Sequence, residues 1–83
     1  MKPQEKHRDL FIIAHEIMYD WQKPFYGAVP YIKALYQLKS IDDYYGMDSA
    51  DMIVRYFLSN ATTWRGETAR RIKAELKQML KQK

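Results

Sequence analysis

The sequence of 83 residues contains no cysteine, only three glycines and three prolines, and no long apolar run. Without cysteine the chain cannot form a disulfide framework, a thiolate zinc site or an iron–sulfur cluster, which fits a reducing compartment. Three scattered glycines exclude a glycine-rich phosphate loop. The longest apolar run, residues 10–14, is too short to span a membrane or to form the core of a signal peptide. We therefore expect a soluble, cytoplasmic protein.

Apolar residues make up 47% of the sequence, aromatic residues 14% and charged residues 29%. This composition is typical of a folded domain that buries a core, and it differs from that of disordered chains. A separate domain usually needs on the order of 100 residues, so a two-domain enzyme is excluded. We expect a single helical domain over residues 1–83, with frayed ends at 1–4 and 81–83.

Apolar residues recur at steps of three and four along the chain, which is the period of one helix face. Pro24, Gly27 and Gly66 interrupt the pattern. The spacing and its breaks predict three main helices over 5–22, 49–61 and 67–80, a short helix over 30–39, and one helical turn over 41–45. No segment alternates as a strand does. The predicted fold class is all-α: a compact orthogonal bundle of three main helices plus one short helix, with no sheet.

Four aspartates lie close together between positions 42 and 51, a density that suggests a cation site. Capping accounts for three of them without a ligand. Asp43 pairs with Ser40 at the start of the turn over 41–45, and Asp48 and Asp51 cap the helix over 49–61. The aspartates also lack the spacing and the terminal glutamate of an EF-hand loop. We therefore predict no metal site here.

The two histidines give no catalytic or metal-binding motif. His15 and Glu16 begin like the HExxH zinc motif, but Tyr19 stands where the second histidine should be. His7 and His15 are too far apart for joint ligation from one straight helix. The serines lie in no nucleophile-elbow context. We predict no catalytic residue, no cofactor and no metal ion, and hence a protein that is not an enzyme.

The formal net charge of +4 is unevenly distributed. Residues 1–63 hold seven Lys and Arg against eight Asp and Glu, a net charge of −1, whereas residues 64–83 hold seven against two, a net charge of +5. The basic character therefore belongs to the last predicted helix. Its candidate residues for binding a partner or nucleic acid are Trp64, Arg65, Arg70, Lys73, Lys77 and Lys81.

The last four of these cations fall on one stripe of the predicted helix. Such a row can replace the counterions condensed on nucleic acid, and Trp64 beside Arg65 can add a stacking or cation–π contact. Alternatively, the cations form an ordinary solvated face that complements the negative end of the helix dipole. The sequence leaves both interpretations open.

Aromatic side chains are more numerous than so small a core requires: seven Tyr, three Phe and two Trp. Tyr and Trp are enriched at protein interfaces, because they bury a large area at low entropic cost and keep a polar atom. Tyrosines can equally close a small core with their hydroxyls in water. The candidate aromatic contact surface consists of Trp21, Phe25, Tyr26, Tyr31, Tyr44 and Tyr45.

Three stretches of the chain resemble small uncharacterised proteins carried by phages and prophages of Gram-positive bacteria. These are 27–31 (Gly-Ala-Val-Pro-Tyr), 45–50 (Tyr-Gly-Met-Asp-Ser-Ala) and 57–70, which begins Phe-Leu-Ser-Asn-Ala-Thr-Thr-Trp-Arg-Gly. The resemblance implies a protein of the bacterial host cell that binds a host or phage protein, or nucleic acid. Its targets would be replication, transcription or a defence system such as a CRISPR nuclease. It assigns no functional residue.

These observations lead to three hypotheses. The first is a non-enzymatic interaction protein that regulates a protein partner by covering its surface. The second is a nucleic-acid-binding protein that uses the basic C-terminal helix. The third is a small structural or self-assembling protein, including a homodimer, in which Leu76, Met79 and Leu80 form a seam between copies.

Overall fold

The computed structural model describes residues 7–81. The frayed ends expected at 1–4 and 82–83 lie outside the described residues, whereas Lys81 is the last helical residue. The elements in chain order are α1 (Leu10–Asp20), the 3-10 turn η1 (Tyr26–Ala28), α2 (Val29–Leu35), β1 (Tyr44–Tyr45), β2 (Asp48–Ser49), α3 (Ala50–Ser59) and α4 (Glu67–Lys81). The protein is mostly helical as predicted, but the expectation of no sheet is wrong.

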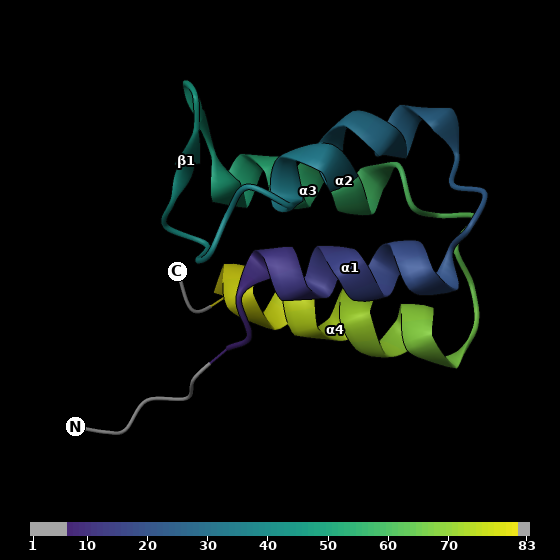
Figure 1. Ribbon diagram of the computed structural model, residues 1–83. Helices are drawn as coiled ribbons and strands as arrows, with labels where there is room; N and C mark the ends of the chain where they lie inside the picture. The colour runs from purple at the N-terminus through teal and green to yellow at the C-terminus, as the bar shows by residue number, and fades with distance from the viewer. Residues whose placement is uncertain (1–6, 82–83) are drawn as a thin grey trace.

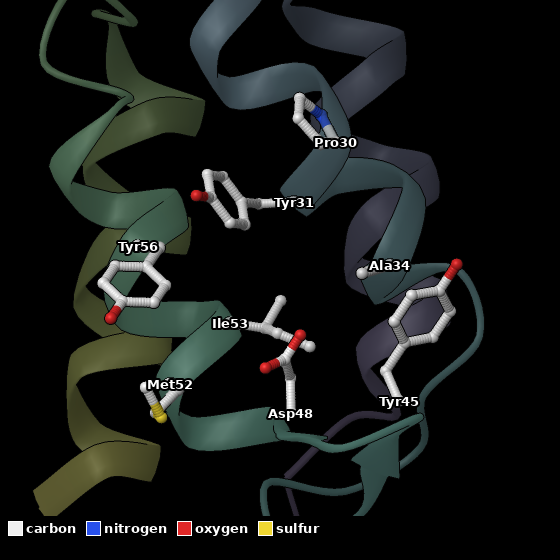
Figure 2. Close-up of a pocket in the computed structure, with 8 residues that line it drawn as sticks. All are labelled: Pro30, Tyr31, Ala34, Tyr45, Asp48, Met52, Ile53 and Tyr56. Atoms are coloured by element: carbon white, nitrogen blue, oxygen red, sulfur yellow. The ribbon is translucent and has the colours of Figure 1, made fainter.

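The four α-helices form two layers, with α1 beside α4 in one layer and α2 beside α3 in the other (Figure 1). The chain runs in alternating directions through consecutive helices, and α1 also packs on α2. Figures 1 and 2 show the helices running along roughly one direction, which differs from the orthogonal crossing expected from the sequence. The short connections over 21–28 and 60–66 favour antiparallel packing of the helices that they join, whereas the longer connection between α2 and α3 contains the hairpin.

The core lies between the two layers and is built from the predicted apolar stripes. All of its side chains in residues 7–81 are apolar. In α4 the buried residues are Ala69, Ile72, Leu76 and Met79, the four that the spacing predicts. Because Leu76 and Met79 are fully used inside the fold, they are not available as a seam between copies.

Helix α2 is shorter than predicted and ends at Leu35 rather than at position 39. The carbonyl oxygens of Leu38 and Lys39 accept hydrogen bonds from the amides of Phe11 and Leu10, at 2.9 and 2.8 Å. These amides belong to the first turn of α1, where the backbone N–H groups have no partner within the helix. The chain after α2 therefore caps the start of α1.

The predicted helical turn over 41–45 is wrong, because Tyr44 and Tyr45 form a β-hairpin with Ser49 and Asp48. The expected capping contacts do form: Oδ2 of Asp43 accepts the amide hydrogen of Ser40 at 3.0 Å. No helix follows them, because Gly46 adopts a φ of +64° in the two-residue turn. Glycine at the first position of such a turn is typical of the tight hairpin type II′.

The connection between α3 and α4 is fixed by Trp64 and Gly66. Gly66 has a φ of +112°, and its carbonyl oxygen accepts the amide hydrogen of Arg70 at 3.0 Å, which starts α4. The indole of Trp64 stacks on that of Trp21, with ring centroids 5.6 Å apart and an angle of 11° between the planes. Its Nε1–H donates to Oδ2 of Asp20 at 2.8 Å. Gly66 therefore separates two helices and does not kink one.

Ion pairs join the chain before α1 to the α1/α4 layer. The Arg8 guanidinium donates to both carboxylate oxygens of Glu75, at 3.0 and 2.7 Å, and to Glu16 at 2.9 Å. Arg71 also donates to Glu16. These hydrogen bonds, that with Glu75 above all, raise the pKa of Arg8. The hydrogen bonds from Arg71 and then Arg8 lower the pKa of Glu16.

Candidate protein-binding groove

A groove of about 250 Å³ opens between α2 and α3 on the side of the molecule that carries the hairpin (Figure 2). Both helices and both strands contribute to its wall. Its lining residues are Pro30, Tyr31, Ala34, Tyr45, Asp48, Met52, Ile53 and Tyr56. All but one are apolar or aromatic. The groove is therefore an apolar surface that residues 7–81 leave uncovered.

The local sequence explains how each wall is positioned. Pro30 lies in the first turn of α2, where its missing N–H is not needed, and Tyr31 follows it. Met52 and Tyr56 stand four residues apart in α3, so they lie one above the other on one helix face. The rings of Tyr31 and Tyr56 meet across the two helices, with centroids 5.6 Å apart.

The hairpin completes the groove. In the antiparallel register Tyr45 pairs with Asp48, and Figure 2 shows their side chains on the side that faces α2 and α3. The amide of Ala50 donates to the carbonyl oxygen of Asp43 at 2.8 Å, which fixes the hairpin to the start of α3. The strand pairing thus holds one aromatic ring and one carboxylate against the helices.

Three large side chains of the groove remain substantially exposed: Met52 at 41%, Tyr45 at 44% and Tyr56 at 46%. Tyr31 is half-buried. Met47 at the tip of the hairpin is 95% exposed. Single exposed apolar residues are ordinary, but several that converge on one concave surface are typical of a binding site.

The predicted aromatic contact surface is only partly gathered here. Tyr31 and Tyr45 line the groove, whereas Trp21 is buried in the core against Trp64 and Phe57. The exposed rings of Phe25, Tyr26 and Tyr44 lie outside the groove lining, although Phe25 and Tyr26 contact each other.

Of the eight residues that line the groove, only Tyr31 and Tyr45 belong to the predicted contact surfaces. The polar and exposed members that the sequence does not point to are Met52, Tyr56 and Asp48, the last of which the sequence predicts as a helix cap. In the structure Ser49 is the residue before α3 and Asp48 belongs to β2. The spacing of Met52 and Tyr56 was the available signal, because it sets them on one face.

Only some residues of the predicted basic surface on α4 are exposed to solvent. Arg65, Arg70, Lys77 and Lys81 are exposed, but Trp64 is only 2% exposed and offers no ring to a partner. Lys73 lies over the Trp64 ring, 5.9 Å from its centroid, and its Nζ donates to the Trp64 carbonyl oxygen at 2.7 Å. Burial, followed by the charges of Lys77 and Arg65, lowers the pKa of Lys73.

Two further classes of site have no counterpart in residues 7–81. No group of three or more His, Asp or Glu side chains lies close enough together there to hold a metal ion. None of the helices in this part of the chain is both long and apolar enough to cross a membrane.

Comparison of the chain with protein-family models, with curated proteins and with solved structures finds no match. The groove and the charges around it are therefore the features of the molecule that bear on its function.

Proposed function

We propose that this protein is a non-enzymatic interaction module that binds a partner protein through the groove between α2, α3 and the hairpin. The observation that carries the proposal is the convergence of exposed Tyr45, Met52 and Tyr56 on one concave surface. Aromatic residues and methionine are enriched in the cores of protein interfaces, and tyrosine is among the residues that contribute most to binding energy there. In line with its resemblance to small phage proteins, the expected partner is a host or phage protein that the module regulates.

The size of the groove also favours a protein partner over a cofactor or a small-molecule substrate. Sites for such ligands usually enclose roughly 300–1,000 Å³ and bury most of the molecule. The groove here holds about 250 Å³ and is open to solvent. It suits one or two side chains of a larger partner, whose remaining surface would cover the exposed hairpin.

Site-specific photo-cross-linking tests the location of the interface. A photo-reactive phenylalanine derivative is placed at Tyr56 in the groove or at Tyr19, which is 81% exposed on α1 in the other layer. We expect one protein to be captured from bacterial cells at position 56 and not at position 19. Equal capture at both positions would contradict the proposal.

The captured partner, once purified, allows a matched pair of substitutions. Tyr56→Glu places a charge in the groove and is expected to weaken binding at least tenfold, since truncating or charging an interface anchor costs on the order of 2 kcal/mol. Tyr19→Glu introduces the same charge at another exposed tyrosine and is expected to leave the affinity unchanged. Retained affinity of the Tyr56→Glu protein would exclude the groove.

A second candidate function is nucleic-acid binding by α4. It is favoured by the exposed side chains of Arg65, Arg70 and Lys77, for which residues 7–81 supply no acidic partner. Binding of this kind must weaken steeply with salt, because it releases condensed counterions. Lys77→Glu should then weaken binding more than Lys33→Glu on α2, and affinity that is insensitive to salt would exclude this function.

A further inference from the structure

The groove contains one charged side chain, the exposed carboxylate of Asp48. Figure 2 shows it projecting from the hairpin into the space between α2 and α3, with Met52 on one side and Tyr45 on the other. No lining residue is a Lys, Arg or His. Within residues 7–81 the Asp48 side chain has neither an ion pair nor a hydrogen bond. Its negative charge is thus left for a ligand to neutralise.

Asp51, the other acidic residue near the start of α3, has partners within the fold. Asp51 accepts a hydrogen bond from the Ser49 hydroxyl at 2.6 Å and lies 3.9 Å from the Arg55 guanidinium. This leaves Asp48 as the carboxylate that faces the groove.

The walls beside this carboxylate are aromatic. Tyr31 and Tyr56 contact each other at an angle of 42°, and Tyr45 stands opposite them across the groove in Figure 2. The faces of aromatic rings carry negative potential and attract cations within about 6 Å of the ring centroid. A cation in the groove would therefore meet a carboxylate and ring faces together.

Arginine satisfies this combination better than lysine. Its planar guanidinium can stack on a tyrosine ring while its N–H groups donate in pairs to a carboxylate. Lysine presents a compact, strongly hydrated charge that does not stack. The methylene stem of arginine can lie against apolar side chains such as Met52 and Ile53.

We propose that the groove accepts an arginine side chain of the partner protein, which stacks on the tyrosine rings and pairs with Asp48. This inference rests on the proposed function and specifies the chemistry of the partner. The partner segment presents arginine at the centre of the contact, and the groove selects against segments that present a carboxylate there.

The test uses N-acetyl-arginine methylamide as the probe and NMR of the protein labelled with ¹³C in its methionine methyl groups. Met52 reports on the groove, and the buried Met79 of α4 is an internal control. We expect the Met52 signal to shift saturably with a millimolar dissociation constant while the Met79 signal stays in place. The lysine analogue should bind at least threefold more weakly, and the glutamate analogue should not bind.

A pair of charge-neutralising substitutions identifies the counter-ion. Asp48→Asn should weaken binding of the arginine probe at least fivefold. Asp9→Asn, at an exposed aspartate that makes no side-chain capping bond and lies outside the groove, should leave it unchanged. Circular dichroism confirms that both variants fold. Equal affinity of the Asp48→Asn and unaltered proteins, stronger binding of lysine, or an unresponsive Met52 would each overturn the inference.

The two proposals can fail separately. If a partner cross-links at position 56 but the probe does not bind, the arginine inference is wrong and the protein-binding function stands. If the probe binds with the expected dependence on Asp48 but position 56 captures no partner, the chemistry of the groove is supported and the protein-binding function is contradicted.

Discussion

Trp64→Phe separates a structural role of this tryptophan from the surface role that the sequence suggested. Phenylalanine keeps an aromatic ring against Trp21 and Phe57 but removes the Nε1–H that donates to Asp20 at 2.8 Å. A hydrogen bond to a charged group contributes about 1.5–3 kcal/mol, and the exposure of Asp20 places this one near the lower end. The smaller ring also leaves part of the indole space empty. We expect a loss of about 2 kcal/mol.

That loss is large for a protein of this size. At roughly 0.05–0.15 kcal/mol per residue, a chain of 83 residues has a total stability of about 4–12 kcal/mol. A loss of about 2 kcal/mol should lower the melting temperature by roughly 10 °C. Trp64→Ala, which removes the ring altogether, should cost about 4 kcal/mol and bring the fold close to its limit.

Urea unfolding followed by far-ultraviolet circular dichroism measures these values, because the midpoint falls in proportion to the stability lost. Asp20→Asn is the control for the hydrogen bond: it keeps an acceptor, removes the charge and should cost about 1 kcal/mol. The stacked indoles of Trp21 and Trp64 also supply a spectroscopic signal that Trp64→Phe abolishes and Asp20→Asn retains. An unchanged midpoint in Trp64→Phe would refute the structural role.

Three further predictions concern stability. Hydrogen bonds from Arg71 and Arg8 hold the pKa of Glu16 below its ordinary 4.5, so this carboxylate binds protons less readily in the folded state. The stabilisation of the fold by ionised Glu16 is therefore complete above pH 4.5 and is lost as pH falls through the folded pKa. Glu16→Gln should remove this acid dependence in denaturation curves and cost only about 0.5 kcal/mol at neutral pH, and an unchanged dependence would contradict the pairing. Gly46→Ala should lower stability by about 1 kcal/mol through its φ of +64° alone, since open space surrounds the new Cβ; an unchanged melting temperature would count against that conformation. Lys73→Met keeps an apolar stem over Trp64 and removes a partly buried charge, so the melting temperature should change by less than about 4 °C. A larger fall would mean that the hydrogen bond from Lys73 to the Trp64 carbonyl oxygen outweighs the cost of burying the charge.

The helices were predictable where their stability comes from a local pattern. The start of α4 at Glu67 and its four buried residues follow directly from apolar spacing and from the break at Gly66. The early end of α2 at Leu35 does not follow from the apolar spacing, which continues to Leu38. The segment after α2 is held by hydrogen bonds from the first amides of α1, which lie far away in the sequence, to the carbonyls of Leu38 and Lys39. No local pattern records a hydrogen bond of that kind.

The hairpin and the groove escaped prediction for related physical reasons. Strands of two residues are too short to display alternation, and the capping pair of Ser40 and Asp43 forms the same contacts in a turn as at a helix start. Of the residues in the predicted aromatic contact surface, Tyr31 and Tyr45 line the groove. The sequence predicts Trp64 as a contact residue beside Arg65, but the ring is buried, because its stack on Trp21 depends on how α1 and the α3–α4 connection meet.

The division of the fold into two layers explains why binding and stability can be tested separately. Trp21 and Trp64 lie in the core, and the pairs of Arg8 and Glu16 join the chain before α1 to the α1/α4 layer. The groove lies on the opposite layer, and three of its side chains, Tyr45, Met52 and Tyr56, are more than two-fifths exposed. Substitution of exposed residues usually changes stability by about 0.5 kcal/mol. A groove variant that loses its partner should therefore keep its melting temperature. A core variant should lose both together, and only to the extent that it unfolds.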